Sequence, residues 1–359
     1  MDADHPALHS PLHGVRVVEF EGIGPGPMAG RLLTQMGAEV TLIARPQANV
    51  MTQRVMGDAD NPLRHGKHIV VLDLKTPAAL AQALDLLADA DVLIEGHRPG
   101  VMERLGLGPA DCAVRNPRLI YGRMTGWGQD GPLAQSAGHD LNYVALSGLL
   151  SVSARPGERP IVPPTVVGDA SGALGLAFGI VCALFEARAS GRGRVVDAAI
   201  VDITSMLGGL LHWLHAGGNI AGPQPSAFHD SPFYDVYTCA DGGFITLGAL
   251  EPSFYALLLQ RLGLHDVDAA QQYERAQWPA LKARFTTLFR SRSRDAWCTL
   301  LEGSDVCFAP VLSIDEAARH PHNLARATFS VSADGAILAR AAPRFSEPCL
   351  DHRGQHKRG

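Results

Sequence analysis

The sequence predicts an α/β protein with a large Rossmann-like parallel-sheet domain and a smaller α+β domain. β-rich runs alternate with helical patterns over the first half of the 359 residues, which is typical of a parallel sheet covered by helices on both faces. A Gly/Pro/Asn/Ser stretch at 217–230 then precedes a hairpin signal. The length also suits two domains at roughly 150 residues each.

Each expected element follows from its local pattern, since runs of β-branched residues mark strands and apolar residues three and four apart mark helices. Strands of the larger domain are expected at 15–20, 40–44, 69–72, 92–94 and 119–121, and helices at 27–36, 77–87, 170–188 and 200–215. The smaller domain is expected to hold a hairpin, 233–238 and 244–247, and helices at 253–262, 279–290 and 295–301. The larger domain is predicted to cover 1–220 with 326–359 returning to it, and the smaller one 221–325.

Composition and charge exclude several classes of function. Lys+Arg 31 against Asp+Glu 36 gives a net charge of −5, so no basic field attracts nucleic acid or a membrane surface. Six cysteines without a C-x-x-C spacing are typical of buried thiols in a reducing compartment. The first ten residues lack an apolar signal segment, and the apolar stretch at 170–185 is short for a membrane span. We therefore expect a cytoplasmic protein that binds neither nucleic acid nor membrane.

Basic residues follow successive strands of the expected sheet. Arg45, Lys75, Arg98 and Arg104 lie just beyond the strands at 40–44, 69–72 and 92–94. Ligands of open α/β sheets bind outside the carboxyl ends of the strands, so these side chains suit a nucleotide that carries an extra phosphate, such as NADP or coenzyme A. The glycines at 22–30 do not have dinucleotide-binding spacing, because Pro25 and Pro27 interrupt them.

Three further residues have both an ordinary structural role and a catalytic one. His139 lies in a loop, within Gly138-His139-Asp140. Asp169 directly precedes an apolar helix, where it is expected as an N-cap. Glu251 precedes Pro252 at another helix start, where the helix dipole favours an acidic residue. Spacing alone selects none of the three.

The segments that contain these residues resemble the α-methylacyl-CoA racemases of the family III CoA-transferase (CaiB/BaiF-type) superfamily. The matching pieces occur in family order over most of the chain. They are 12–19 (LHGVRVVE), 22–27 (GIGPGP), 37–40 (GAEV), 72–75 (LDLK), 98–101 (RPGV), 125–129 (TGWGQ), 137–140 (AGHD), 167–169 (VGD), 232–235 (PFYD) and 247–255 (LGALEPSFY).

The resemblance implies a racemase that interconverts 2-methylacyl-CoA epimers through an enolate. His139 and Asp169 would be the two acid/base groups, and Glu251 would orient the imidazole. Backbone N–H groups at the start of the helix after Asp169 would stabilise the enolate oxygen. Coenzyme A would be part of the substrate, with no separate cofactor and no metal. The implied CoA contacts are Ile23, Arg45, Leu72, Asp73, Leu74, Lys75, Gly96, His97, Arg98, Arg104, Gly138, Asp140, Asn142, Tyr143 and Gly168.

The same resemblance implies an interlocked homodimer whose active site forms between the large domain of one subunit and the small domain of the other. In that arrangement His139 and Asp169 face Glu251 of the other copy, and a monomer is inactive. We expect the site to be shared in this way.

Two alternatives differ in function class. In the transferase branch the residue matching Asp169 is a nucleophile that forms acyl intermediates, but the Gly-His-Asp segment and Leu250-Glu251-Pro252, in place of a glycine-rich loop, favour the racemase branch. A catalytically silent acyl-CoA-binding protein is disfavoured because His139, Asp169 and Glu251 are all present. The chain departs from the racemase pattern at 229–231 (HDS) and 64–65 (RH) and has only 8 methionines, so we expect a different acyl pocket.

Overall fold

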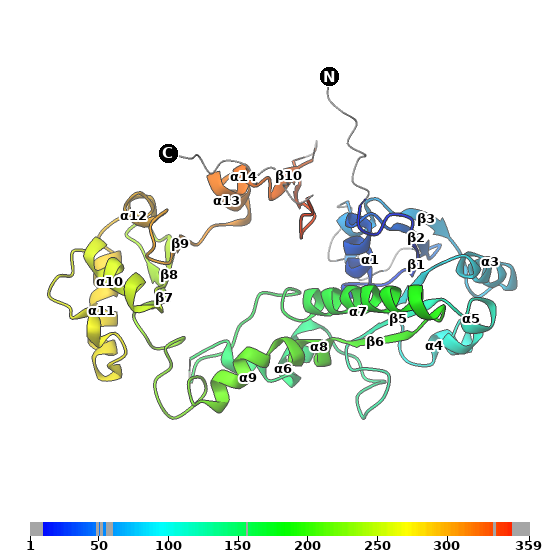
Figure 1. The fold of residues 1–359 in the computed structure, drawn as a ribbon, viewed down its shortest axis with the longest axis horizontal. Coiled ribbons are helices and arrows are strands. Elements are labelled where there is room, and N and C mark those ends of the chain that lie inside the picture. Colours follow the sequence, from blue (N-terminus) through cyan, green and yellow to red (C-terminus); the bar gives the residue numbers. More distant parts are fainter. Residues whose placement is uncertain are drawn as a thin grey trace, which may run out of the picture. The chain divides into compact units, whose positions relative to one another are not determined.

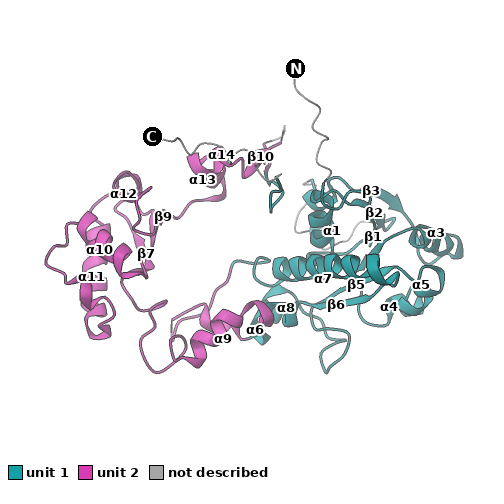
Figure 2. Cartoon of the chain, viewed as in Figure 1, with its two compact units in different colours: residues 1–147, 163–204, 338–359 teal, residues 148–162, 205–337 magenta. Residues whose placement is uncertain are grey.

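The computed structural model divides the chain into two units, which Figure 2 colours separately. It describes residues 10–47, 50, 53–54, 60–155, 157–332 and 335–346. Unit 1 comprises 1–147, 163–204 and 338–359, and unit 2 comprises 148–162 and 205–337. The larger domain was expected to run to 220, whereas this division assigns 205–220 and the excursion 148–162 to unit 2.

Unit 1 is built on a six-stranded, all-parallel sheet in the order β3-β2-β1-β4-β5-β6. Figure 1 labels β1, β2, β3, β5 and β6 of this sheet. This strand order is that of a Rossmann fold, so the predicted fold class is confirmed. The order in which successive strands are added changes direction between β1 and β4, and such folds bind ligands at this switch point. The strands are β1 (Arg16–Phe20), β2 (Glu39–Ala44), β3 (His68–Val71), β4 (Val92–Glu95), β5 (Ile120–Thr125) and β6 (Val195–Ala199).

Helices cover both faces of this sheet because strand residues alternate between them. Val17 of β1 belongs to the core shared with α1 and α7, whereas Val18 and Phe20 belong to the core shared with α3, α4 and α5. The helices of unit 1 are α1 (Pro25–Gln35), η1 (Pro62–Arg64), α3 (Pro77–Ala88), α4 (Val101–Arg104), α5 (Pro109–Arg115), α6 (Asp140–Leu146), α7 (Asp169–Ser190) and the first half of α8 (Ile200–Leu207).

Helix α7 has two different faces. Ala173, Leu176 and Ile180 are buried in the core with β5 and β6. On the opposite face Leu174, Phe178, Val181 and Phe185 are between 42% and 80% exposed, and they recur at helical spacing. In the described part of the chain, α7 is also the helix with the length and apolar character of a membrane span. Its buried face is that of a core helix, as predicted, and its exposed apolar face was not foreseen.

Unit 2 has its own sheet and its own core. Antiparallel strands β7 (Tyr234–Thr238), β8 (Phe244–Gly248) and β9 (Phe308–Pro310) form the sheet, and the predicted hairpin is confirmed. An aromatic cluster that includes Phe233, Tyr255 and Phe289 fills the core. The other elements are η2 (Leu149–Val152), α9 (Gly209–Ala216), α10 (Pro252–Arg261), η3 (Ala269–Gln271), η4 (Arg275–Gln277), α11 (Trp278–Phe289), α12 (Arg294–Leu301), α13 (Ile314–Arg319), α14 (Pro321–Ala325) and β10 (Phe329–Val331). The division between the units falls within β11 (Ile337–Ala339), after its first residue.

Candidate active site

A cavity of about 260 Å³ in unit 1 contains two of the three predicted catalytic side chains, His139 and Asp169. Its walls are the loops that follow β1, β4 and β5, so it lies at the carboxyl edge of the sheet, as expected for this fold. His139 and Asp169, which are 30 positions apart in the sequence, therefore line the same cavity. Among the predicted CoA contacts, Ile23, Gly96, His97, Arg98, Gly138 and Tyr143 line the same cavity.

Asp169 is the first residue of α7, and its environment is half-buried. The N-cap is Gly168, so the expectation that Asp169 caps this helix is wrong. Gly24, in the turn before α1, has a φ of +72° and approaches so closely that an added Cβ would lie 3.0 Å from Asp169 Oδ2. Burial raises the pKa of Asp169 to about 6, and the negative charge of Asp140 adds to that rise while His139 opposes it. An acid with this pKa can both give and take a proton near neutral pH.

The backbone N–H groups at the start of α7 are already engaged. Those of Gly168 and Asp169 both donate to Asp140 Oδ2, at 2.8 Å and 2.7 Å. That of Ala170 donates to the carbonyl of Thr165 at 3.1 Å. The N–H groups of Asp169, Ala170 and Ser171 were expected to be open to an enolate oxygen. For Asp169 and Ala170 this is wrong, because Asp140, distant in the sequence, accepts the first and the nearby Thr165 accepts the second.

His139 is fixed through its backbone at the start of α6. Its N–H donates to Asn142 Oδ1 at 3.0 Å, and its carbonyl accepts from the N–H of Asn142 at 2.8 Å. The hydroxyl of Tyr143 donates to the carbonyl of Gly138. An added Cβ on Gly138 would lie 2.7 Å from the Tyr143 ring and 2.9 Å from Trp127. Close packing thus holds the loop that presents the imidazole to the cavity.

A second cavity, of about 770 Å³, lies beyond the carboxyl ends of β2 and β3. It is lined by six of the predicted CoA contacts, namely Arg45, Leu72, Asp73, Leu74, Lys75 and His97. Two basic side chains from different strand ends therefore meet there, as the sequence predicted. Phe20 and His97 line both cavities, so the two are neighbours.

Four of the predicted CoA contacts line neither cavity. Arg104 is the last residue of α4. Asp140 accepts a hydrogen bond from the N–H of Gly168, and the side chain of Asn142 accepts one from the N–H of His139. Their contact with coenzyme A stays a prediction.

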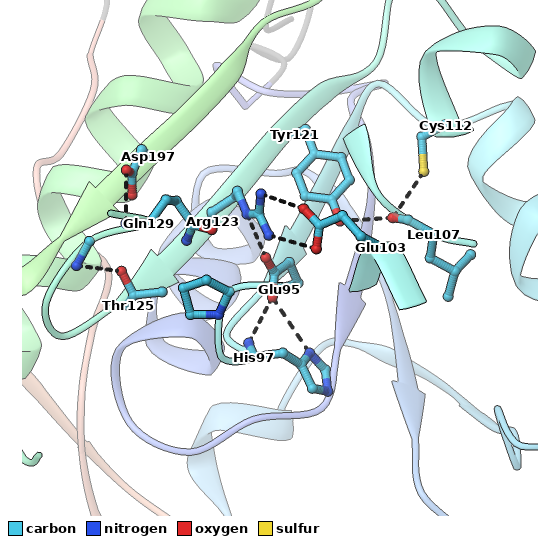
Figure 3. Close-up of polar contacts among 12 residues, drawn as sticks. Glu95, His97, Glu103, Leu107, Cys112, Tyr121, Arg123, Thr125, Gln129 and Asp197 are labelled. Atoms are coloured by element: carbon cyan, nitrogen blue, oxygen red, sulfur yellow. Dashed lines mark hydrogen bonds and ion pairs between the residues drawn. The ribbon is translucent and has the colours of Figure 1, made fainter. Parts of the chain in front are cut away.

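Sequence reasoning missed a polar network beside the His97 loop (Figure 3). Arg123 of β5 donates from Nε to Glu95 Oε1 at 3.0 Å and from Nη1 to Glu103 Oε1 at 2.9 Å. Glu95 Oε2 accepts the N–H of His97 at 2.7 Å. A buried arginine in an otherwise apolar strand was the available signal, since such a charge needs carboxylate partners. The network fixes the loop that separates the two cavities.

Glu251 lies in unit 2, where it is the exposed N-cap of α10. The carbonyl of its neighbour Leu250 accepts from Tyr273 Oη at 2.6 Å and from Gln272 Nε2 at 3.0 Å, which fixes the turn before α10. Its pairing with His139 stays a prediction.

The unusual 229–231 segment is also in unit 2. The carbonyl of His229 accepts from Arg155 Nε at 2.7 Å and from Lys282 Nζ at 3.1 Å, and both cations pair with Asp235. This departure from the racemase pattern is therefore a fixed piece of backbone.

Comparison with known proteins identifies the family. Residues 12–352 match CoA-transferase family III. The chain is 41% identical to the α-methylacyl-CoA racemase of Mus musculus (93% of this chain, 86% of the relative) and 39% identical to that of Homo sapiens (92% and 86%). It is 32% identical to a probable fatty acyl-CoA transferase, Rv3272, of Mycobacterium tuberculosis (85% and 82%). A crystal structure of Rv3272 superposes with a TM-score of 0.79 at 29% identity, covering 94% of this chain and 93% of that one. The chain belongs to CoA-transferase family III.

Proposed function

We propose that the protein is a 2-methylacyl-CoA racemase that interconverts the (R) and (S) thioesters by 1,1-proton transfer. The observation that carries this is the meeting of His139 and Asp169 in one cavity beside a second, basic cavity. Identity of about 40% to two racemases over most of the chain supports the same reaction.

The reaction needs two acid/base groups, because a proton leaves one face of the carbon next to the thioester and another arrives on the opposite face. Asp169, with its pKa raised to about 6 by burial, is able to take the proton from one epimer and, in the reverse direction, to give a proton back on that same face. His139 serves the opposite face. In this proposal the enolate oxygen accepts from the indole N–H of Trp127, which lines the cavity and has no acceptor among the described residues.

The CoA part of the substrate is assigned to the larger cavity. Arg45 and Lys75 offer two cations to phosphate oxygens there. The pantetheine chain would pass His97 to bring the thioester to His139 and Asp169, and Arg98 on the wall of the smaller cavity adds a third cation along this path. Coenzyme A arrives as part of the substrate, and we assign no separate cofactor, nucleic acid or membrane partner.

The active enzyme is proposed to be a homodimer in which Glu251 of one copy orients His139 of the other. The exposed apolar face of α7 supports a second copy, because contiguous exposed apolar surface of this kind marks an interaction site. The five described cysteines are unpaired, which supports a cytoplasmic location.

Mixing two inactive variants tests the shared site. If His139 and Glu251 act across the dimer, a chain pair of His139→Ala and Glu251→Ala has one doubly changed site and one intact site. A randomly mixed 1:1 sample should then recover about one quarter of wild-type activity. Recovery no greater than that of the separate variants would place both residues in one subunit.

Isotope exchange tests the reaction itself. In deuterated water, His139→Ala should suppress α-proton exchange from one 2-methylacyl-CoA epimer and Asp169→Ala from the other, with racemisation lost in both. His68→Ala, an exposed histidine on the edge strand β3, is the matched control and should behave as wild type. Absence of exchange in the wild type, together with a covalent acyl adduct at Asp169 by mass spectrometry, would overturn racemisation in favour of CoA transfer.

A further inference from the structure

We propose that Asp140 is a positioning residue for Asp169: its carboxylate ties the start of α7 to the start of α6 and sets a negative charge against the Asp169 side chain. The role of Asp169 as a base rests on the proposed racemase function. The hydrogen bonds of Asp140 are present in the structure whatever the reaction is. The sequence had placed Asp140 among CoA contacts, but it lines neither cavity.

The contacts are specific and buried. Asp140 is 7% exposed, and a single oxygen, Oδ2, accepts the N–H groups of both Gly168 and Asp169. An added Cβ on Gly168 would lie 2.7 Å from Asp140 Oδ2, so only glycine allows this approach. Because His139 directly precedes Asp140 in the chain, the carboxylate links the backbones of the two proposed bases.

The link has an electrostatic consequence for Asp169. The free N–H groups of a helix start favour a nearby anion, so an open α7 terminus would hold Asp169 ionised. Asp140 occupies two of these donors and brings a like charge. Both effects oppose ionisation of Asp169, and the negative charge of Asp140 is the second cause, after burial, of its raised pKa.

The other groups near Asp169 either lower its pKa or carry no charge that would change it. His139 lowers the pKa of Asp169 by its charge. Tyr143, whose own pKa is raised by burial and by Asp169, is held by its bond to Gly138. From the glycine turn before α1 the nearest neighbour is Gly24, which has no charge. Asp140 is thus the group that opposes His139 in setting the protonation of Asp169.

Asp140→Asn separates charge from geometry. The amide keeps an oxygen where both N–H groups donate, but removes the negative charge. The pKa of Asp169 is raised from 3.8 to about 6 by two causes, of which Asp140 is the smaller, so its loss should lower the titration midpoint of Asp169 by about one pH unit. The midpoint is read from the carboxyl carbon resonance of labelled aspartate, assigned with Asp169→Asn.

Exchange kinetics give a second measurement. For the epimer served by Asp169, the acid limb of the pH profile should move down by about one pH unit, and the plateau rate should fall roughly threefold because a weaker base removes the proton more slowly. The epimer served by His139 should change less, and the KM for the CoA thioester should stay constant. Asp111→Asn is the matched control, since Asp111 accepts the N–H of Gly108 at the start of α5, away from both cavities.

The outcomes separate this proposal from the function. A lower Asp169 midpoint in Asp140→Asn, with no exchange activity in the wild type, would keep the role of Asp140 and overturn racemisation. An unchanged midpoint and an unchanged acid limb in Asp140→Asn would overturn the role of Asp140. Asp140→Glu, which restores the charge with a longer side chain, should return the midpoint toward the wild-type value.

Discussion

Replacing Lys67 by methionine should strongly destabilise unit 1. Lys67 Nζ donates hydrogen bonds to Glu19 Oε2 at 2.5 Å and to the Pro27 carbonyl at 2.9 Å, and the side chains of Lys67 and Glu19 are both fully buried. The other carboxylate oxygen of Glu19 has no partner among the described residues. Removing the lysine leaves a buried carboxylate uncompensated, which costs about 3–5 kcal/mol. For a unit of this size, that corresponds to a fall in Tm of roughly 6–20 °C.

The cost should depend on pH in a known direction. Burial raises the pKa of Glu19 to about 7 even though Lys67 opposes the rise, so without the lysine it is higher still. A carboxyl whose folded pKa exceeds its unfolded one stabilises the fold at low pH, and this contribution is lost as pH rises through the folded pKa. The wild type already loses this contribution up to pH 7, whereas the variant, with its higher Glu19 pKa, goes on losing it above pH 7. The cost of the substitution should therefore grow between pH 7 and pH 8, by up to about 1.4 kcal/mol per pH unit.

Urea unfolding of Lys67→Met at pH 5.5 and pH 8 measures both effects. Arg284→Met is the control, because it breaks an ion pair with Asp266 whose side chains are 42% and 67% exposed, and it should cost under about 1 kcal/mol at either pH. Adding Glu19→Gln to Lys67→Met should recover stability at pH 8. A cost for Lys67→Met equal to the control, or equal at the two pH values, would refute the reasoning.

Two further substitutions address the site. Gly126→Ala should reduce kcat at least about tenfold, because the added Cβ would overlap the Tyr143 ring that holds the His139 loop. Steady-state kinetics measure this, and an unchanged kcat would contradict it. Arg45→Ala should weaken CoA binding about tenfold, and by less at high salt, because salt screens the charge of the arginine. Calorimetry measures the affinity, and Arg118→Ala, which changes an exposed arginine, is the control. An unchanged affinity in Arg45→Ala would remove Arg45 from the site.

The local sequence pattern was sufficient to predict most strands of the parallel sheet. Five of the six parallel strands were predicted within a few residues, because buried parallel strands are continuous apolar runs. β6 was missed because Val195–Ala199 has only two β-branched residues beside a charge. The helix expected at 200–215 is divided at Gly208, where a Cβ would lie 2.7 Å from Leu149. Such a close approach is a tertiary contact that spacing does not record.

The site was predictable in its residue types and not in its contacts. Placing basic residues after successive strands brought Arg45 and Lys75 together, since parallel strands end at one edge. The acceptor at the start of α7 was not predictable, because it comes from Asp140, 29 positions earlier. Asp169 has the residue type of an N-cap, but the helix begins one residue earlier than that role requires.

If the proposed assignment of coenzyme A to the larger cavity is right, the two cavities that share Phe20 and His97 give the nucleotide a part in the rate as well as in binding. A thioester anchored at its distant end has its reacting carbon placed by groups that never touch it, and binding energy gained far from the reaction can lower the barrier. A pantetheine thioester without the nucleotide would still fill the smaller cavity, but it could pivot there. For such a shortened substrate the turnover rate, and not only the affinity, would decline.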